Sequence, residues 1–280
     1  MEKIFLRAAL QNGAKRINMG LGFTLAATFL HFNASANSVS LGSAADFSVL
    51  AASAITSTGA TAINGGDVGV SANTSTSITG FPPGTLASSS SFVGGATAGA
   101  DASAAYTTLK DETVNAVNGT LSGQDLGGLT LTPGVYYFAT SAQLTGRLTL
   151  DGEGESDPFF DIQIGSTLTT ASAASIVLEN DAQAANVFWQ VGSAATLGTG
   201  TTFQGNILAE TSISDAGGST VYGRLLALGG AVTLIDTTVN VPQAEGSGGA
   251  APDTGSTLLL LGSALAALFA FGRRFSVLLR

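Results

Sequence analysis

The stretch GTGTTFQGNILA at 198–209 decides the fold, because related stretches follow it at 216–227 (AGGSTVYGRLLA) and 234–241 (LIDTTVNV). Laid over one another, the three repeat at a constant interval, which leads from Thr202 to Thr220 and then to Thr238. The column beside these threonines is apolar and holds Phe203, Val221 and Val239. Neighbouring side chains of a strand point to opposite faces, so the apolar column points inward and the threonine column outward. These columns predict a solenoid of stacked coils.

A longer repeat lies upstream, where the alternating apolar pattern of Phe160, Ile162 and Ile164 recurs at Val187, Trp189 and Val191. Coils of these two lengths, with about three strands each, predict a mainly β protein built as an irregular three-sided parallel β-helix. Thr58-Gly59-Ala60-Thr61 precedes Ala62 much as Thr199-Gly200-Thr201-Thr202 precedes Phe203. We therefore expect an early segment to supply one coil of the stack.

One segment has helical rather than strand periodicity. From about Asp101 to Asn118, apolar residues recur at intervals of three and four, which predicts an amphipathic helix at 101–118. Asp101 is the expected N-cap and Gly119 the expected C′ residue. A single helix cannot bury its apolar stripe alone, so we expect it to pack along one side of the solenoid.

The N-terminal segment has the layout of an export signal. Basic residues precede an apolar run and the small-residue site Ala34-Ser35-Ala36, which predicts a signal peptide at 1–36. The solenoid domain is then expected at 37–242, in a protein that is secreted or held at the cell surface.

The C-terminal segment resembles a bacterial sorting signal. After a flexible linker at 243–251, the tail at 252–280 carries Pro252-Asp253-Thr254-Gly255, an apolar run from Thr257 to Phe271 and then Arg273-Arg274. This order is similar to exosortase-type and sortase-type signals, which implies a sorting transpeptidase as partner. A plain membrane-anchoring tail is the alternative, although the run is shorter than the roughly 20 residues that span a bilayer.

The composition between 37 and 251 argues against several classes of function. Only Lys110, Arg147 and Arg224 are basic there, against 17 acidic residues, so nucleic-acid binding is disfavoured. The chain has no cysteine, and its one histidine, His31, lies in the expected signal peptide. Histidine-dependent triads and common zinc sites are therefore excluded from the expected mature protein.

An acidic turn, DGEGESDP, follows the strand that ends near 151. Asp151, Glu153, Glu155 and Asp157 supply hard oxygen ligands, so a calcium site is one interpretation. Their spacing is not that of an EF-hand, and a solvated turn is the simpler interpretation. Paired carboxylates could also serve a polysaccharide-active enzyme.

The order of several segments resembles a family of microbial ice-binding proteins. The stretches that carry the resemblance are LGSAADFSVLAASAITSTGATAINGGDVGV, LTLTPGVYYF, NVFWQVGSAATLGTGTTFQGNILA and VYGRLLALGGAVTL. The resemblance implies an irregular triangular β-helix with one α-helix alongside. It also implies adsorption to ice by one flat Ser/Thr-rich face, without a cofactor.

A threonine ladder suits that activity, because stacked strands space its methyl and hydroxyl groups evenly. Members of the family carry a loose T-[AG]-x-[TN] pattern, which 58–61 and 199–202 match. We therefore expect the ice-binding residues to be Thr58, Thr61, Ser175, Thr199, Thr201, Thr202, Ser219, Thr220 and Thr238. Ala216, Tyr222 and Asp236 interrupt this face. A second possible face lies on the preceding strands: Thr167, Thr169, Thr196, Ser212, Ser214 and Thr233.

Two other functions stay open at this point. The same solenoid could be a spacer in a non-enzymatic surface adhesin or matrix protein, since threonine also favours exposed β-strands. A polysaccharide-active enzyme is the other alternative, although few aromatic residues are available to stack on sugars. A non-enzymatic, monomeric ice-binding protein is the leading hypothesis.

Overall fold

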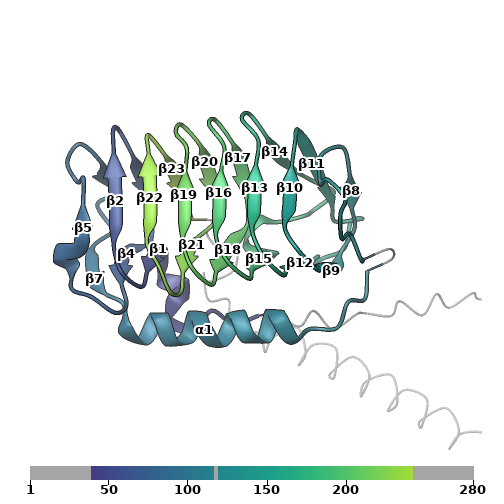
Figure 1. Ribbon diagram of the computed structural model, residues 1–280, viewed down its shortest axis with the longest axis horizontal. Helices are drawn as coiled ribbons and strands as arrows, with labels where there is room; N and C mark the ends of the chain where they lie inside the picture. Colours follow the sequence, from purple (N-terminus) through teal and green to yellow (C-terminus); the bar gives the residue numbers. More distant parts are fainter. Residues whose placement is uncertain (1–38, 117–118, 242–280) are drawn as a thin grey trace, which may run out of the picture. The chain divides into compact units, whose positions relative to one another are not determined.

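A computed structural model describes residues 39–116 and 119–241 of the chain. These residues form three parallel β-sheets that wind into a three-sided solenoid, with one α-helix, α1 (Ala96–Asp111), lying along it (Figure 1). The predicted fold class is therefore confirmed. The export signal, linker and sorting tail expected at 1–36, 243–251 and 252–280 lie outside the described residues.

Each sheet contains one strand from most coils, and its strands follow one another along the solenoid. Sheet A runs β7 (Phe92–Gly94), β4 (Asp67–Val70), β1 (Phe47–Ala51), β21 (Leu225–Ala227), β18 (Asn206–Ala209), β15 (Val187–Val191), β12 (Phe160–Ile164), β9 (Gly134–Phe138). Sheet B runs β10 (Ala142–Leu144), β13 (Leu168–Thr170), β16 (Ala195–Leu197), β19 (Ile213–Asp215), β22 (Val232–Ile235), β2 (Ile55–Thr58), β5 (Ile78–Thr79). Sheet C runs β6 (Thr85–Leu86), β3 (Ala62–Asn64), β23 (Thr238–Asn240), β20 (Thr220–Tyr222), β17 (Thr202–Gln204), β14 (Ser175–Glu179), β11 (Arg147–Asp151), β8 (Thr130–Leu131).

Three short 3-10 helices occur among the described residues: η1 (Gly42–Asp46), η2 (Ser75–Ser77) and η3 (Ala184–Asn186). Each ends where a sheet A or sheet B strand begins, so they complete the longer turns.

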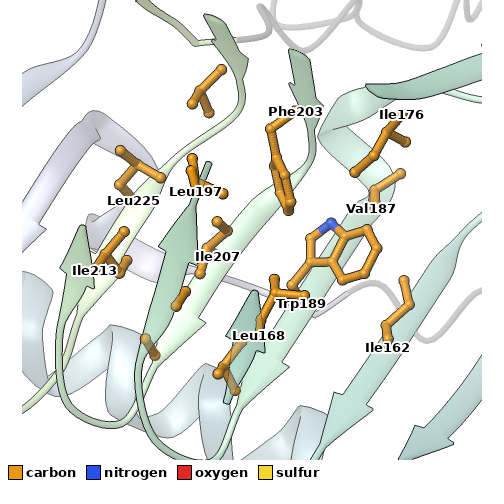
Figure 2. Packing of buried hydrophobic residues seen from close by; sticks show 14 of the residues in the cluster. Ile162, Leu168, Ile176, Val187, Trp189, Leu197, Phe203, Ile207, Ile213 and Leu225 are labelled. Carbon is orange, nitrogen blue, oxygen red and sulfur yellow. The ribbon is translucent and has the colours of Figure 1, made fainter. Parts of the chain in front are cut away.

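The strand registers confirm both repeat intervals predicted from the sequence, the longer one upstream and the shorter one near the C-terminal end of the solenoid. Phe160 pairs with Val187 across one of the longer coils, and Thr202 pairs with Thr220 across one of the shorter coils. The inward column is Phe203, Val221 and Val239, all without exposed surface. Trp189 lies in the same core, with its ring centroid 5.2 Å from that of Phe203 (Figure 2). Its indole nitrogen donates to the Gln204 carbonyl at 3.0 Å, so the one polar atom of this ring is satisfied.

The early segment completes the stack, as expected. Strands β1, β2 and β3 pair with β21, β22 and β23, and β4 to β7 extend the three sheets beyond them (Figure 1). Residues from opposite ends of the described chain therefore become neighbours, as when Val49 pairs with Leu225.

Helix α1 covers sheet A and no other sheet. Its buried residues recur on one side, at Ala98, Ala102, Ala105, Tyr106 and Leu109. They pack with apolar side chains from the outer face of sheet A: Leu50, Phe188, Leu208 and Leu226. Small residues on the helix allow it to lie close to the strands, so both faces of the central strands of sheet A, from β1 to β12, are buried.

The helix bounds predicted from the sequence are wrong at both ends. The helix begins at Ala96, after Gly95, and ends at Asp111. Asp101 lies inside it, where its carboxylate accepts bonds from the Ser43 amide at 2.8 Å and the Ser43 hydroxyl at 2.6 Å. Asp101 therefore fastens η1 to the helix instead of capping it. Gly119 is distant from the end of the helix, because Glu112 is already extended.

Within the described residues, α1 is too short and too polar to cross a bilayer, and no other helix there meets that requirement either.

Candidate functional site

The outer faces of sheets B and C are the two broad surfaces that α1 leaves uncovered. Both carry threonines at regular intervals, but they differ in charge and in side-chain size. The arrangement of each face follows from the strand registers.

The outer face of sheet B carries an unbroken row of polar side chains, one on each strand. Consecutive members are directly paired residues: Gln143, Thr169, Thr196, Ser214, Thr233, Thr56 and Thr79. We call this row the B ladder. Six of its seven members are threonine or serine, and none is charged. Neighbouring rungs are one strand spacing apart, about 4.8 Å.

A second row runs beside the B ladder, two residues earlier in each coil and directly before the strand begins. Its members are all small: Ser141, Thr167, Ala194, Ser212, Ala231, Ala54 and Ser77. Backbone bonds tie successive members to the neighbouring coil, as when the Leu168 amide donates to the Ala194 carbonyl at 3.1 Å. The Thr167 hydroxyl donates to Ser141 Oγ at 2.8 Å. The two rows together form an uncharged surface of short side chains except at the end of the ladder, where Gln143 pairs with Asp125.

The outer face of sheet C is less uniform. Its threonine row is Thr202, Thr220 and Thr238, extended by Ser175 and Arg147 on one side and by Ala62 and Thr85 on the other. Arg147 forms an ion pair with Glu179 at 2.7 Å. The next row contains Gln204, Tyr222 and Asn240, and 41% of Tyr222 is exposed. This face therefore combines charge with bulky side chains.

Six of the nine ice-binding residues predicted from the sequence keep exposed surface. Thr202, Thr220, Thr238 and Ser175 lie half-buried on the outer face of sheet C, whereas Thr199 is exposed in the turn after β16. Thr58 is exposed at the end of β2 on sheet B, where it pairs with Ile235. The structure thus divides the predicted set between two faces.

The prediction is wrong for Thr61, Thr201 and Ser219, which are almost fully buried. They lie at the corner between sheets B and C, where the chain turns and strand alternation no longer decides which way a side chain points. Thr201 Oγ1 bonds to the Gly198 carbonyl at 2.7 Å and to Thr170 Oγ1 at 2.8 Å. These hydroxyls therefore stabilise the corner and are not available to ice.

Thr61 also shows the effect of a register error of one residue. The comparison of 58–61 with 199–202 places Thr61 in the column of Thr202. In the structure, Ala62 is the residue that pairs with Thr238 in that column. A shift of one residue moves a side chain to the opposite face. Thr61 consequently points into the corner, and Ala62 occupies the outward position.

Three residues of the B ladder, Thr56, Thr79 and Gln143, are not among the candidate ice-binding residues predicted from the sequence. Thr56 and Thr79 each follow an isoleucine that points inward, Ile55 and Ile78, in the same way that Thr233 follows Val232. This apolar–threonine pairing is the signal that could have identified them.

Hydrogen bonds stabilise part of the negative charge in the acidic turn. Asp151 accepts bonds from the Asn180 amide group at 2.8 Å and from the Glu153 backbone amide at 2.9 Å, and these bonds lower the pKa of Asp151. No cluster of three or more acidic, histidine or cysteine side chains suited to a metal occurs between residues 39 and 241, leaving aside 117–118.

Comparison with known proteins identifies the family. The family model described as ice-binding-like matches residues 49–240, more than half of the chain. The chain belongs to the ice-binding-like family. One relative in this family, an ice-binding protein of Nostoc sp. (strain HG1), is 46% identical over 242 residues, which cover 84% of this chain and 87% of the relative. An ice-binding protein of Flavobacterium frigoris (strain PS1) is 35% identical, with coverage of 73% and 77%.

Solved structures with the ice-binding-like fold agree with the architecture. The ice-binding protein of the Antarctic ascomycete Antarctomyces psychrotrophicus superposes with a TM-score of 0.69 at 39% identity, over 74% of this chain and all of that one. An ice-binding protein from an Antarctic biological consortium gives 0.67 at 41% identity, over 72% and 90%.

Proposed function

We propose that this protein adsorbs to ice through the outer face of sheet B and thereby inhibits ice growth or recrystallisation. The B ladder is the observation that carries the proposal. Its six consecutive serine and threonine residues form the longest uncharged row of hydroxyl side chains on the described surface, and family membership supplies ice as the ligand.

The chemistry of the B ladder fits an ordered water surface. Its hydroxyl groups can hydrogen-bond water at fixed positions, while the threonine methyl groups restrict the water between them. Parallel coils hold the rungs at a constant spacing, and the buried core keeps the strands from moving independently. Water can therefore be ordered in the same pattern over the whole face.

Sheet C is a poorer candidate for the same role. A charged guanidinium and carboxylate strongly bind liquid-like water, and the ring of Tyr222 stands above its neighbours. Both features oppose close contact with a flat crystal face. The face of Thr202, Thr220 and Thr238 is thus the alternative that the experiment must exclude.

The proposed protein is not an enzyme and works without a cofactor. It is secreted or held at the cell surface as a monomer, with the tail at 252–280 processed by a sorting transpeptidase. The signal layout, the tail motif and relatives named for ice binding support this part of the proposal.

Two matched substitutions test the ice-binding face. Thr196→Tyr places a ring in the interior of the B ladder, and Thr220→Tyr places the same ring in the interior of the threonine row of sheet C. We expect the first to reduce thermal hysteresis and incorporation into a growing ice hemisphere at least tenfold, and the second to leave both within about twofold of the original protein.

Circular dichroism and thermal unfolding of both variants serve as fold controls. If Thr220→Tyr abolishes activity and Thr196→Tyr does not, sheet C is the ice-binding face. Exclusion of the unmodified protein from ice would contradict ice binding altogether and favour the adhesin.

A further inference from the structure

A carboxyl group is enclosed between helix α1 and sheet A, and no amide or hydroxyl group of the described residues donates to either of its oxygens. It belongs to Asp161 on β12, which is 1% exposed. Alternation along β12 directs Asp161 outward, away from the solenoid core, but this part of sheet A is covered. A buried polar group without a hydrogen bond is costly, and a buried charge is more so. The position of Asp161 therefore requires an explanation.

The end of α1 is bound to the same strand. Gln163 Nε2 donates to the Leu109 carbonyl at 2.7 Å and to the Glu112 carbonyl at 2.8 Å. Gln163 thus adds a side-chain donor at the C-terminal end of the helix, where carbonyls lack donors within the helix. The carboxyl group of Glu112 lies within hydrogen-bonding reach of that of Asp161. Strand β12 consequently holds the last turn by one amide and one pair of carboxyl groups.

The surroundings disfavour a charge on Asp161. The paired residues on the flanking strands, Val135 on β9 and Phe188 on β15, are not titratable. Glu112 directly follows α1, the C-terminal end of the helix adds the negative end of its dipole, and the charged residues of its last turn, Lys110 and Asp111, are exposed. Two ionised carboxylates in this position would repel each other.

Tyr106, one turn earlier on α1, faces a different coil. Its hydroxyl donates to Glu210 Oε2 at 3.1 Å. It therefore does not supply the proton that Asp161 needs.

We propose that Asp161 and Glu112 share one proton, and that this proton is a pH-sensitive latch holding the last turn of α1 on sheet A. A proton accounts for the pair better than a cation. A bound calcium ion takes six to eight oxygen ligands, and Gln163 already occupies the nearby carbonyls of Leu109 and Glu112. When the proton leaves, two like charges face each other under the helix, and the last turn separates from β12.

The sign of the pH dependence follows from the pKa. Burial, followed by the hydrogen bond to Glu112 and its negative charge, raises the pKa of Asp161 to about 9. In the unfolded chain the pKa of an aspartate is about 3.9. Between these values the folded protein holds a proton that the unfolded chain releases. The free energy of unfolding therefore keeps this contribution fully below about pH 4 and loses it as the pH rises through about 9.

Asp161→Asn in the full chain tests the latch. The amide has the shape of the carboxyl group and donates permanently to Glu112, so it imitates the protonated state at every pH. We expect the midpoint temperature of thermal unfolding to decrease from mildly acidic to alkaline pH, and to decrease more in the original protein than in the variant. Amide exchange at 109–112, corrected for intrinsic rates, should rise with pH in the original protein alone. Asp111→Asn removes the same charge from the exposed side of α1 and should leave the original pH profile unchanged.

Direct titration distinguishes the latch from a merely structural role. The carboxyl carbon resonance of Asp161 should titrate far above the normal range for aspartate. Parallel pH profiles for the original protein and Asp161→Asn would overturn the proposal, as would a resonance that titrates in the ordinary range. Stabilisation by calcium of the original protein but not of the variant would overturn it too, since a cation would then replace the proton.

Glu112→Gln provides a second test of the same pair if Asp161→Asn fails to fold. Its amide can donate to an ionised Asp161, so the titration of Asp161 should move to lower pH. An unchanged titration would show that Glu112 is not the partner, and the latch would be rejected.

Discussion

Asp215 is the centre of the polar corner between sheets B and C. It is 2% exposed, and it accepts bonds from the Ser219 hydroxyl at 2.5 Å and the Thr237 hydroxyl at 2.6 Å. The Thr237 amide in turn donates to Thr61 Oγ1 at 3.4 Å. Of the hydroxyls expected to contact ice, that of Ser219 is therefore bound to this buried carboxylate, and that of Thr61 is bound to the backbone of the same corner.

Removing that carboxylate should destabilise the solenoid. Asp215→Ala leaves two buried hydroxyls without their acceptor, and we expect the free energy of unfolding to fall by about 3 kcal/mol. Urea denaturation measures the change. Glu155→Ala, in the exposed acidic turn, is the matched control and should alter stability by less than about 0.5 kcal/mol. Equal stability of both variants would mean that the corner bonds contribute little.

Sequence reasoning succeeded for residues inside strands and failed at corners, for a physical reason. Alternation correctly separates Phe203 from Thr202, because both lie in a paired strand of regular geometry. Thr201 is only one residue away, yet the chain turns there and its side chain is directed by bonds to Thr170 and Gly198. No periodic pattern in the sequence encodes such a bond.

Among the elements, β2 shows how far the face of sheet B depends on the early segment. It comes from the first quarter of the chain but lies between β22 and β5, so Thr56 continues the row after Thr233. The ladder would end at β22 without it. A short amphipathic pattern such as Ile55-Thr56 predicts a strand, but its place in the sheet depends on β22, which is supplied by the other end of the described chain.

The position of β2 leads to a prediction about ice activity. Thr56→Tyr should reduce thermal hysteresis about as much as Thr233→Tyr, because the two rings would protrude from adjacent rungs of one face. Thr85→Tyr, on β6 at the edge of sheet C, serves as the control and should have little effect. Full activity of Thr56→Tyr would restrict the functional face to β10–β22.

The helix boundary illustrates a limit at the same scale. The apolar stripe correctly predicts a helix against one side, and Ala102, Ala105 and Leu109 are indeed buried. Its start was misplaced because Ala96 and Thr97 are small and exposed, and so give no periodic signal. The end depends on Glu112, whose extended backbone and contact with β12 are tertiary features.

At the scale of the whole molecule, the two repeat intervals were sufficient to predict three sheets and a parallel winding. They could not decide which of the two free faces is flat and uncharged. That difference depends on single positions: Arg147 and Tyr222 interrupt sheet C, whereas the longest side chain of the B ladder is the uncharged Gln143 at its end. A sequence repeat predicts that coils stack, but the flatness of a face becomes clear only when the side chains of all its strands are assembled.

The insertion of β1–β3 after β21–β23 has a consequence for chain connectivity. Val241, the last described residue, lies beside the first coil, since a Cβ atom added to Gly66 would be 3.1 Å from Val241 Cγ2 and 3.2 Å from the Asp46 carbonyl. Val241 could therefore be connected through a linker to the segment that precedes β1, and the chain could be reopened between α1 and β8. In this circular permutant every coil would follow its neighbour in sequence, and α1 would come last.

The permutant should fold faster than the natural connectivity, because its strand pairs are local and its contact order is lower. Stopped-flow refolding would measure the rate, and ice affinity would show whether the same face forms. A permutant that folds no faster would indicate that pairing of the early coil is not the slow step. In the natural order, strands β1–β3 are synthesised first but pair with β21–β23, which are synthesised last. The central coils of the solenoid can therefore form only when the described chain is nearly complete.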